Sequence, residues 1–321
     1  MNLSVLGCSG STSYVDDEDR FHGTSAYLLE SQQTRLLLDI GFGANAKLGK
    51  QGLREKIDAL LITHAHGDHI GDLAALGQDL QYPKDEDGAA MPPFPAQIPV
   101  YGPAGIKEEL DQATQHKGFP RPISGVFDFK TFYPAEPLEV GDLSVTLFPV
   151  DHVGLEAYAV RVDGTGERFA YSGDVGEAQP GTPSPGLLKA AQEADLALVE
   201  AFYLKKAEVS SGLHLSGHTA GQAAQAAGAG KVLLTHHHPN VSAERILTEA
   251  HATYSGPIQS AKQGTTYTVS GNFPAGVTYR SALPAHVHDG RPPGTSGGRP
   301  RPTAGPATSN ATCRTPGRKP S

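Results

Sequence analysis

The chain has 321 residues, with 26 lysines and arginines against 34 aspartates and glutamates, and a formal net charge of −8. It contains no run of about 18 apolar residues and no basic segment leading into a long apolar run, so we expect neither a membrane span nor a secretory signal. The two cysteines, Cys8 and Cys313, lie near opposite ends of the chain. We therefore expect no structural disulfide and a reducing, cytoplasmic setting.

Short apolar runs alternate with turns in the first half of the chain and predict strands. These strands are expected at residues 2–6, 25–30, 34–39, 59–63 and 127–132, with a short strand at Val100. Helical spacing predicts helices at residues 68–79 and 102–116. The long loops at residues 7–24 and 81–97 are expected to line the mouth of a site, since loops of this length are uncommon inside a compact domain.

The second half of the chain continues with strands and then alternates strands with helices. Strands are expected at residues 143–150, 157–162, 168–172, 196–200, 231–235 and 265–269, and helices at residues 217–228 and 242–252. This order favours an α/β (α+β) fold in which two sheets are sandwiched between helices.

The last 38 residues have a different composition. Residues 284–321 contain eight prolines, six glycines and six basic residues, without apolar periodicity. We expect one folded domain at residues 1–283 and a disordered Pro/Gly/Arg-rich tail at 284–321. Without the tail, the body holds 20 basic and 33 acidic residues, a net charge of −13. So acidic a body is a poor general binder of nucleic acid.

Three histidines and an aspartate directly follow a predicted apolar strand: His64, His66, Asp68 and His69. His64 and His66 stand two residues apart in an extended segment and can point the same way. Asp68 and His69 begin a helix and can face a second, adjacent point. Imidazole and carboxylate together suit zinc, and also manganese or iron. The motif therefore predicts two neighbouring metal positions.

Further ligands are expected where other strands end. His152 follows strand 143–150, Asp174 follows strand 168–172, and His236 follows strand 231–235. Loops at strand ends can converge on one site that rigid elements hold in place. Each of these residues taken singly suits an ordinary turn, but their order after the histidine motif favours metal binding.

This pattern resembles the metallo-β-lactamase superfamily, and within it the ribonuclease Z-like hydrolases and cyclic nucleotide phosphodiesterases. The resemblance implies an αββα sandwich with a dinuclear metal site, most simply two zinc ions. It implies one metal at His64, His66 and His152, a second at Asp68, His69 and His236, and Asp174 as a bridge. Asp39 matches an acid that supports a ligand histidine in that family.

Two further matches concern catalysis. Glu200, in Leu198-Val199-Glu200-Ala201-Phe202, resembles a motif of ribonuclease Z-like enzymes, and His218-Thr219-Ala220 resembles a second one. The resemblance implies that His218 pairs with Glu200 beside the scissile phosphate. Asp68 is the expected general base, and His236 is the expected ligand within His236-His237-His238.

The expected metal ligands and catalytic residues indicate the reaction class, but they leave the substrate open. Mature ribonuclease Z carries a tRNA-gripping arm between the residues that match His152 and Asp174, but here a predicted hairpin fills the 21 residues between them. We therefore expect a metal-dependent hydrolase, most simply a phosphodiesterase on small or cyclic nucleotide substrates. A ribonuclease Z-type tRNA 3′ endonuclease, a thioesterase or lactonase, and a non-catalytic metal-binding protein are the alternatives.

The expected partners follow from the same reasoning. They are a small phosphodiester substrate, with nucleic acid less favoured and no membrane. Because family members often form dimers, a homodimer is also open.

Overall fold

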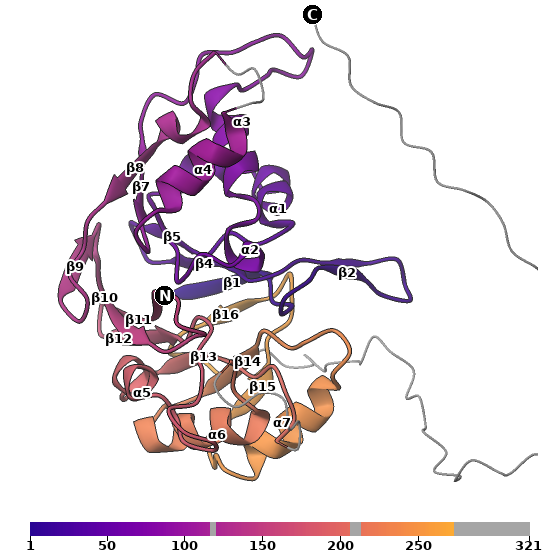
Figure 1. Ribbon diagram of the computed structural model, residues 1–321, viewed down its shortest axis with the longest axis vertical. Helices are drawn as coiled ribbons and strands as arrows, with labels where there is room; N and C mark the ends of the chain where they lie inside the picture. Colours follow the sequence, from indigo (N-terminus) through magenta and orange to yellow (C-terminus); the bar gives the residue numbers. More distant parts are fainter. Residues whose placement is uncertain (116–119, 206–212, 273–321) are drawn as a thin grey trace, which may run out of the picture. The chain divides into compact units, whose positions relative to one another are not determined.

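The computed structural model describes residues 1–115, 120–205 and 213–272 (Figure 1). The chain divides into two units, Met1–Pro284 and Ala285–Ser321, and every element described below belongs to the first. The tail expected at residues 284–321 lies outside the described residues.

The first sheet has seven strands in the order β16-β1-β4-β5-β6-β7-β8. Pairing is antiparallel from β16 to β5 and parallel from β5 to β8. The bounds of its strands are β1 Asn2–Gly7, β4 Ala26–Glu30, β5 Arg35–Leu38, β6 Ala59–Leu61, β7 Ile98–Tyr101, β8 Phe127–Lys130 and β16 Thr266–Thr268.

The second sheet also has seven strands, in the order β15-β14-β13-β12-β11-β10-β9. Its strands pair antiparallel from β9 to β12 and parallel from β12 to β15. The bounds are β9 Pro137–Val140, β10 Leu143–Val150, β11 Ala157–Gly164, β12 Glu167–Tyr171, β13 Leu196–Glu200, β14 Val232–Thr235 and β15 Ile258–Ser260.

Alternation along the buried strands creates three layers of apolar core. In β5, Leu36 and Leu38 face the second sheet, while Leu37 faces the helices on the outer side. Figure 1 shows one group of helices outside each sheet. These are α1 (Ala44–Lys50), α3 (Leu73–Gln81) and α4 (Ile106–Thr114) on the first sheet, and α5 (Pro185–Ala191), α6 (Gly217–Ala227) and α7 (Ala243–His251) on the second. The expected αββα sandwich is confirmed.

The helices after the histidine motif differ from the expectation. The helix predicted at residues 68–79 is two helices, α2 (Gly67–Ile70) and α3, with Asp72 between them. Asp72 Oδ2 accepts hydrogen bonds from the N–H groups of Gly43 and Asn45, at 2.9 Å each. The break thus lets a carboxylate between α2 and α3 cap the start of α1.

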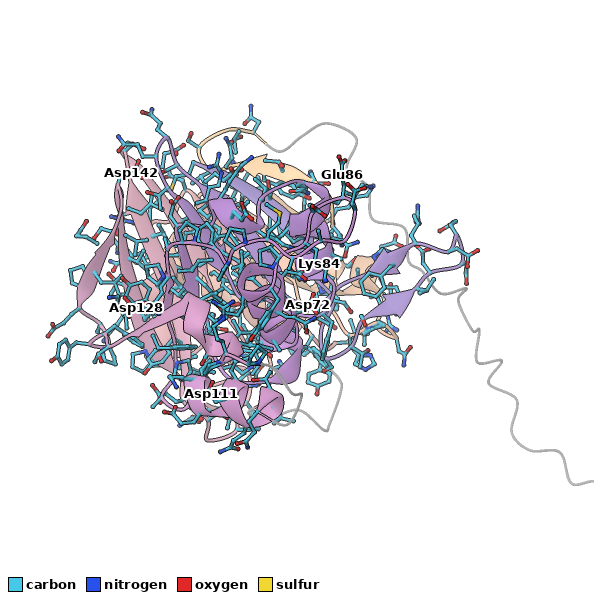
Figure 2. All side chains as sticks on the ribbon, turned by 90° about the horizontal axis from the view of Figure 1, so that it is seen from above. Asp72, Lys84, Glu86, Asp111, Asp128 and Asp142 are labelled. Carbon is cyan, nitrogen blue, oxygen red and sulfur yellow. The ribbon has the colours of Figure 1, made fainter. Side chains whose placement is uncertain are left out.

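Several short elements were not predicted. They are helices α1 and α5, strands β9 and β15, and the 3₁₀ turns η1 (Arg54–Lys56) and η2 (Ile123–Val126). Strands β2 (Tyr14–Val15) and β3 (Phe21–His22) also lie within the expected loop at residues 7–24, where they form a hairpin that stands out from the sandwich in Figures 1 and 2.

Acidic side chains are spread over the surface of the folded unit. Asp111, Asp128 and Asp142, partly exposed, come from three separate elements or turns (Figure 2). None of the helices in the described part of the chain combines the length and apolar composition that a membrane span requires.

Candidate metal centre

The histidine motif lies where strand β6 ends. Ala59–Leu61 is buried between β5 and β7, and the chain leaves the sheet through His64, which is also buried. His66 is extended and directly precedes α2, whose first turn contains Asp68 and His69. This short connection presents four polar side chains at one edge of the sandwich.

Three histidines and Asp174 form the first cluster. Nε2 of His64 and Nε2 of His152 each lie 3.1 Å from Nδ1 of His66. Asp174 Oδ2 lies 3.6 Å from Nε2 of His64 and 3.8 Å from Nε2 of His152. Burial lowers the pKa of His152 to about 4 and the pKa of His64 well below its ordinary value. Both rings are therefore neutral at pH 7, the form that binds metal ions.

The second cluster shares Asp174 with the first. Asp174 Oδ1 lies 3.1 Å from Nε2 of His69, and Asp174 Oδ2 lies 3.2 Å from Nε2 of His236. Asp68 Oδ2 completes the group at 3.8 Å from Nε2 of His69 and 3.7 Å from Nε2 of His236. The structure thus brings all seven expected ligand residues into two adjoining groups, with Asp174 between them.

The chemistry of these groups fits a divalent cation. Within the described residues, His69 Nε2, His236 Nε2 and Asp174 Oδ1 are buried and have no hydrogen-bond partner. An orphaned buried polar atom costs about 1–3 kcal/mol, and a cation among these three atoms would remove that cost. In each cluster the candidate ligand atoms lie within 4.8 Å of one another. Imidazole and carboxylate are the donors that zinc, manganese and iron accept.

Asp39 supports the second cluster from behind, as expected. Its Oδ2 lies 2.7 Å from Nδ1 of His69. The Asp39 carboxylate also accepts hydrogen bonds from the backbone N–H of Thr63, at 2.7 Å, and from the Tyr171 hydroxyl, at 2.8 Å. Such contacts fix which ring nitrogen of a ligand histidine faces the metal.

Other candidate ligand rings are held through their second nitrogen as well. Nδ1 of His152 donates to the carbonyl of Leu213 at 2.7 Å, and Nδ1 of His236 lies 3.0 Å from Ser25 Oγ. His237, the next residue, turns away from the clusters and has its Nδ1 2.8 Å from the carbonyl of Ala201. Within the run of three histidines, only His236 belongs to either cluster.

The loop at residues 7–24 contributes a contact that the sequence did not indicate. The backbone N–H of Ser11, a residue with φ of 59°, donates to Asp68 Oδ2 at 2.8 Å. This expected mouth loop therefore reaches the centre. The other expected mouth loop, residues 81–97, makes no hydrogen bond to a residue of either cluster within the described part of the chain; the Phe94 N–H in this loop donates to the carbonyl of Leu80.

The expected pairing of His218 with Glu200 is wrong. Glu200 is fully buried at the end of β13, and its Oε1 lies 3.0 Å from Nδ1 of His214. Burial acts to lower the pKa of His214, but the Glu200 carboxylate outweighs this effect and raises the pKa to about 9. His214 also stacks on Phe202, and its Nδ1 lies 3.9 Å from Asp174 Oδ2. Nε2 of His218 instead lies 3.0 Å from Nζ of Lys205.

The reason lies in where α6 begins. Ser216 is its N-cap and accepts a hydrogen bond from the Thr219 N–H at 3.1 Å. His218 is therefore in the first helical turn, whereas His214 precedes the cap, next to Leu215, whose N–H donates to Glu200 Oε2 at 3.3 Å. The predicted helix at residues 217–228 already places His218 inside the helix and His214 before it; the pairing of His218 with Glu200 was expected only from the resemblance of His218-Thr219-Ala220 to a family motif.

Comparison with known proteins agrees with this geometry. A family model described as "Beta-lactamase superfamily domain" matches residues 34–237. An uncharacterized protein of Mycobacterium tuberculosis is 32% identical over 273 residues, which cover 84% of this chain and 92% of that protein. The crystal structure of the metallo-beta-lactamase fold protein YhfI from Bacillus subtilis superposes with a TM-score of 0.66 at 26% identity, over 83% of this chain and 99% of that one.

A third relative matches over a shorter range. A ribonuclease Z of Methanopyrus kandleri is 29% identical over 154 residues, 47% of this chain and 46% of that protein. The fold, the paired His/Asp clusters and these matches together identify the family: this chain belongs to the metallo-β-lactamase superfamily and has the fold of its metal-dependent hydrolases.

Proposed function

We propose that this protein is a phosphodiesterase that uses two divalent cations, most simply zinc, to hydrolyse a small phosphodiester such as a cyclic nucleotide. The observation that carries the proposal is the Glu200–His214 pair beside two clusters that share Asp174. Two adjoining cations lower the pKa of water and neutralise the charge of a phosphoryl group, chemistry that suits phosphodiester hydrolysis.

The residues of this chain supply the remaining functions. Because Glu200 engages Nδ1 of His214, Nε2 is the ring nitrogen left to donate a proton to the leaving oxygen of the substrate. The Ser11 N–H fixes Oδ2 of Asp68, so Oδ1 is the oxygen that can take a proton from the attacking water. Asp68 is thus the proposed general base and His214 the proposed general acid, in the role first expected of His218.

The small size of the substrate is inferred from the segment between His152 and Asp174. The residues from His152 to Asp174 form only a turn, β11 and β12. The hairpin pairs Asp163 with Arg168 and Gly164 with Glu167, so its turn is tight and no arm extends from it. A short hairpin here and an acidic body both favour a small substrate over tRNA.

The test compares two substrates on one metal-loaded preparation. Hydrolysis of 3′,5′-cyclic AMP is measured beside cleavage of a 3′-extended precursor tRNA, with the double variant His64→Ala/His66→Ala as the metal-site control. We expect turnover of the cyclic nucleotide, lost in the double variant, and no tRNA cleavage.

Cleavage of the precursor tRNA at its 3′ end, also lost in the double variant, would instead establish a ribonuclease Z-type endonuclease. The match to the ribonuclease Z of Methanopyrus kandleri makes this the second candidate. Absence of turnover of either substrate in a fully metallated sample would refute both.

A further inference from the structure

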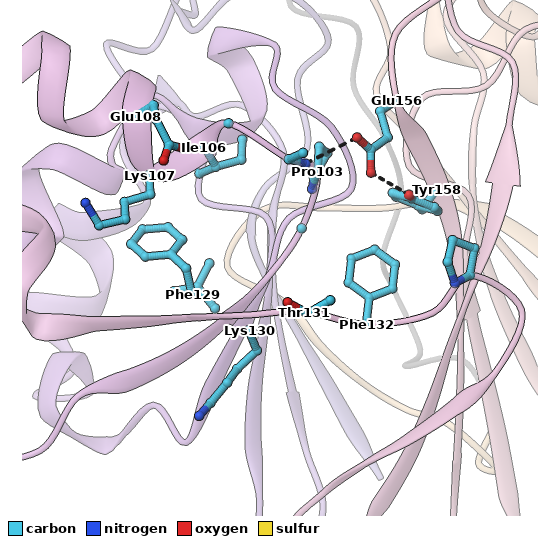
Figure 3. Close-up of a pocket in the computed structure, with 15 residues that line it drawn as sticks. Pro103, Ile106, Lys107, Glu108, Phe129, Lys130, Thr131, Phe132, Glu156 and Tyr158 are labelled. Carbon is cyan, nitrogen blue, oxygen red and sulfur yellow. Dashed lines mark hydrogen bonds between the residues drawn. The ribbon is translucent and has the colours of Figure 1, made fainter.

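A cavity of about 400 Å³ opens at the edge of the sandwich (Figure 3). It is lined by the ends of β7 and β8, by the start of α4 and by the segment that enters β11. Its volume lies in the range of small-molecule binding sites. Neither the metal centre nor the proposed catalytic residues line it.

Two connections place the cavity next to the metal centre. The Tyr158 N–H donates to the carbonyl of Thr63, the residue before His64, at 3.1 Å. Glu156 follows His152 by four residues in the same connection. Tyr158 and Glu156 both line the cavity. Residues that line the cavity are therefore joined directly to the two segments that carry His64 and His152.

Three aromatic residues, Phe129, Phe132 and Tyr158, line the cavity. Phe129 and Phe132 are half-buried, and Figure 3 shows Phe129 near Ile106 and Phe132 near Tyr158. The Phe132 and Tyr158 rings are 5.1 Å apart and meet edge to face at 76°. Such surfaces suit a flat aromatic ligand, because a planar ring gains both apolar burial and stacking.

One carboxylate supplies the polar contact. Glu156 Oε1 accepts the Tyr158 hydroxyl at 2.6 Å, and Oε2 accepts the Ala104 N–H at 3.2 Å, the dashed lines of Figure 3. An ionised carboxylate has about four acceptor positions, so this pair of bonds leaves room for N–H donors of a ligand. The carboxylate is exposed at the cavity and held in one orientation.

The lysines at the rim do not make this an anion site. Nζ of Lys107 lies 2.5 Å from Asp111 Oδ2, and Lys130 forms an ion pair with Asp128. Their charges are therefore partly neutralised by neighbours, while Glu156 adds a negative charge. A neutral ring with N–H donors is better matched to the cavity than a phosphate group.

We propose that this cavity binds the base of a purine nucleotide whose phosphodiester lies at the metal centre. The base stacks on Phe129 and Phe132, and its exocyclic amino group donates to Glu156. Adenine and guanine both carry such a group and the larger ring system of the purines. The assignment rests on the proposed function, which it extends from reaction class to substrate recognition.

The experiment separates base recognition from chemistry. Phe129→Leu and Glu156→Gln are compared with Phe94→Leu and Glu139→Gln, controls outside the cavity; Phe94, like Phe129, packs against the outer core of the first sheet. The substrates are 3′,5′-cyclic AMP and glycerol 1,2-cyclic phosphate, a phosphodiester without a base, followed by ³¹P NMR. Binding of AMP to each metal-loaded protein is measured by calorimetry.

We expect each cavity variant to raise KM for cyclic AMP about tenfold, since base stacking and a charged hydrogen bond are each of that order. The turnover number, the kinetics of the base-free substrate and both control variants stay within twofold of wild type. AMP affinity falls by the same factor as KM rises. Phe129→Tyr, which keeps the ring, retains the wild-type KM.

Two results would overturn the assignment: an unchanged KM for cyclic AMP, or equal losses on the nucleotide and on the base-free substrate. If the wild type hydrolyses neither phosphodiester, the proposed function fails. The calorimetric measurement of AMP binding then decides whether the cavity is a base site. AMP binding that weakens in Phe129→Leu and Glu156→Gln alone supports the cavity as a base site. Absent or unaffected AMP binding refutes it.

Discussion

Asp39 Oδ2 lies 2.7 Å from Nδ1 of His69, and both side chains are fully buried. The carboxylate is itself held by the Thr63 N–H and the Tyr171 hydroxyl, so it cannot turn away from the histidine. Nδ1 of His69 is therefore kept as a donor, and Nε2 faces Asp174. The orientation of a candidate ligand in the second cluster therefore depends on Asp39, a residue outside that cluster.

Replacing Asp39 tests this dependence. In Asp39→Asn the negative charge that polarises His69 is lost, and we expect metal affinity to fall by about 10–100-fold. Metal content is measured after dialysis against graded concentrations of chelator. The control is Asp58→Asn, since Asp58 is exposed and accepts the Arg35 N–H far from the clusters. Equal retention of metal by both variants would contradict the supporting role.

Substitution of His214 and of His218 is predicted to have different effects on turnover. In His214→Ala we expect the turnover number to fall about 10²–10⁴-fold, because a general acid contributes on that order. In His218→Ala it should stay within twofold, since this ring contacts Lys205 rather than Glu200. Metal content is measured for both variants. A larger loss in His218→Ala than in His214→Ala, at full metal occupancy, would restore the residue expected from the sequence.

The seven candidate ligands were accessible to sequence reasoning because each lies in the connection that follows a buried strand. Short apolar runs such as residues 59–62 and 232–234 reveal these strands, and the end of each strand indicates where the polar residues lie. His214 was missed although the start of α6 was predicted correctly, because the role was assigned from the resemblance of His218-Thr219-Ala220 to a family motif. The contact that reveals it, between His214 and Glu200, joins residues 14 positions apart.

Other elements depend on contacts that no local pattern contains. Helix α1 begins after Gly43 without a side-chain cap of its own, and its first N–H groups are satisfied by Asp72, which is 29 residues from Gly43. Strand β9 is short and only partly buried, and it is defined by its pairing with β10. The Ser11 contact with Asp68 likewise joins residues 57 positions apart.

The β2–β3 hairpin is predicted to depend on Asp16. Its carboxylate accepts His22 Nε2 and Arg20 Nε, both at 2.8 Å. Burial acts to raise the pKa of Asp16, but these hydrogen bonds outweigh it and hold the pKa well below its usual range. A lowered folded-state pKa gives stability that is present above the unfolded value and is lost as the pH falls below about 4.

We therefore expect Asp16→Asn to speed amide hydrogen exchange in residues 10–24 at pH 7. The difference from wild type should shrink as the pH falls below about 4. The control is Asp19→Asn in the same hairpin turn, because the Asp19 side chain forms no hydrogen bond or ion pair with the described residues. Equal exchange in wild type and Asp16→Asn at pH 7 would contradict the prediction.

Close packing of α6 on α7 gives a stability prediction. A Cβ added to Gly221 would lie 2.5 Å from the carbonyl oxygen of Ala250 and 2.2 Å from Thr253 Oγ1. Because the contact involves backbone, the helices must separate, and we expect Gly221→Ala to lower the free energy of unfolding by about 1–3 kcal/mol. Urea unfolding measures this change. Ala226→Lys, at an exposed position of the same helix, should change it by about 0.5 kcal/mol or less.

Metal removal should destabilise the fold as well as abolish activity. The clusters hold buried nitrogen and oxygen atoms that lack partners, so a cation that binds only the folded chain adds stability, about 2.7 kcal/mol at a free concentration of 100 times Kd. We expect a chelator to lower the Tm of the wild type by several degrees, measured by calorimetry. His64→Ala/His66→Ala, which has lost two ligands, should respond much less. A chelator shift of equal size in both proteins would show that the metal acts elsewhere, and no shift in either would show that the clusters hold no stabilising cation.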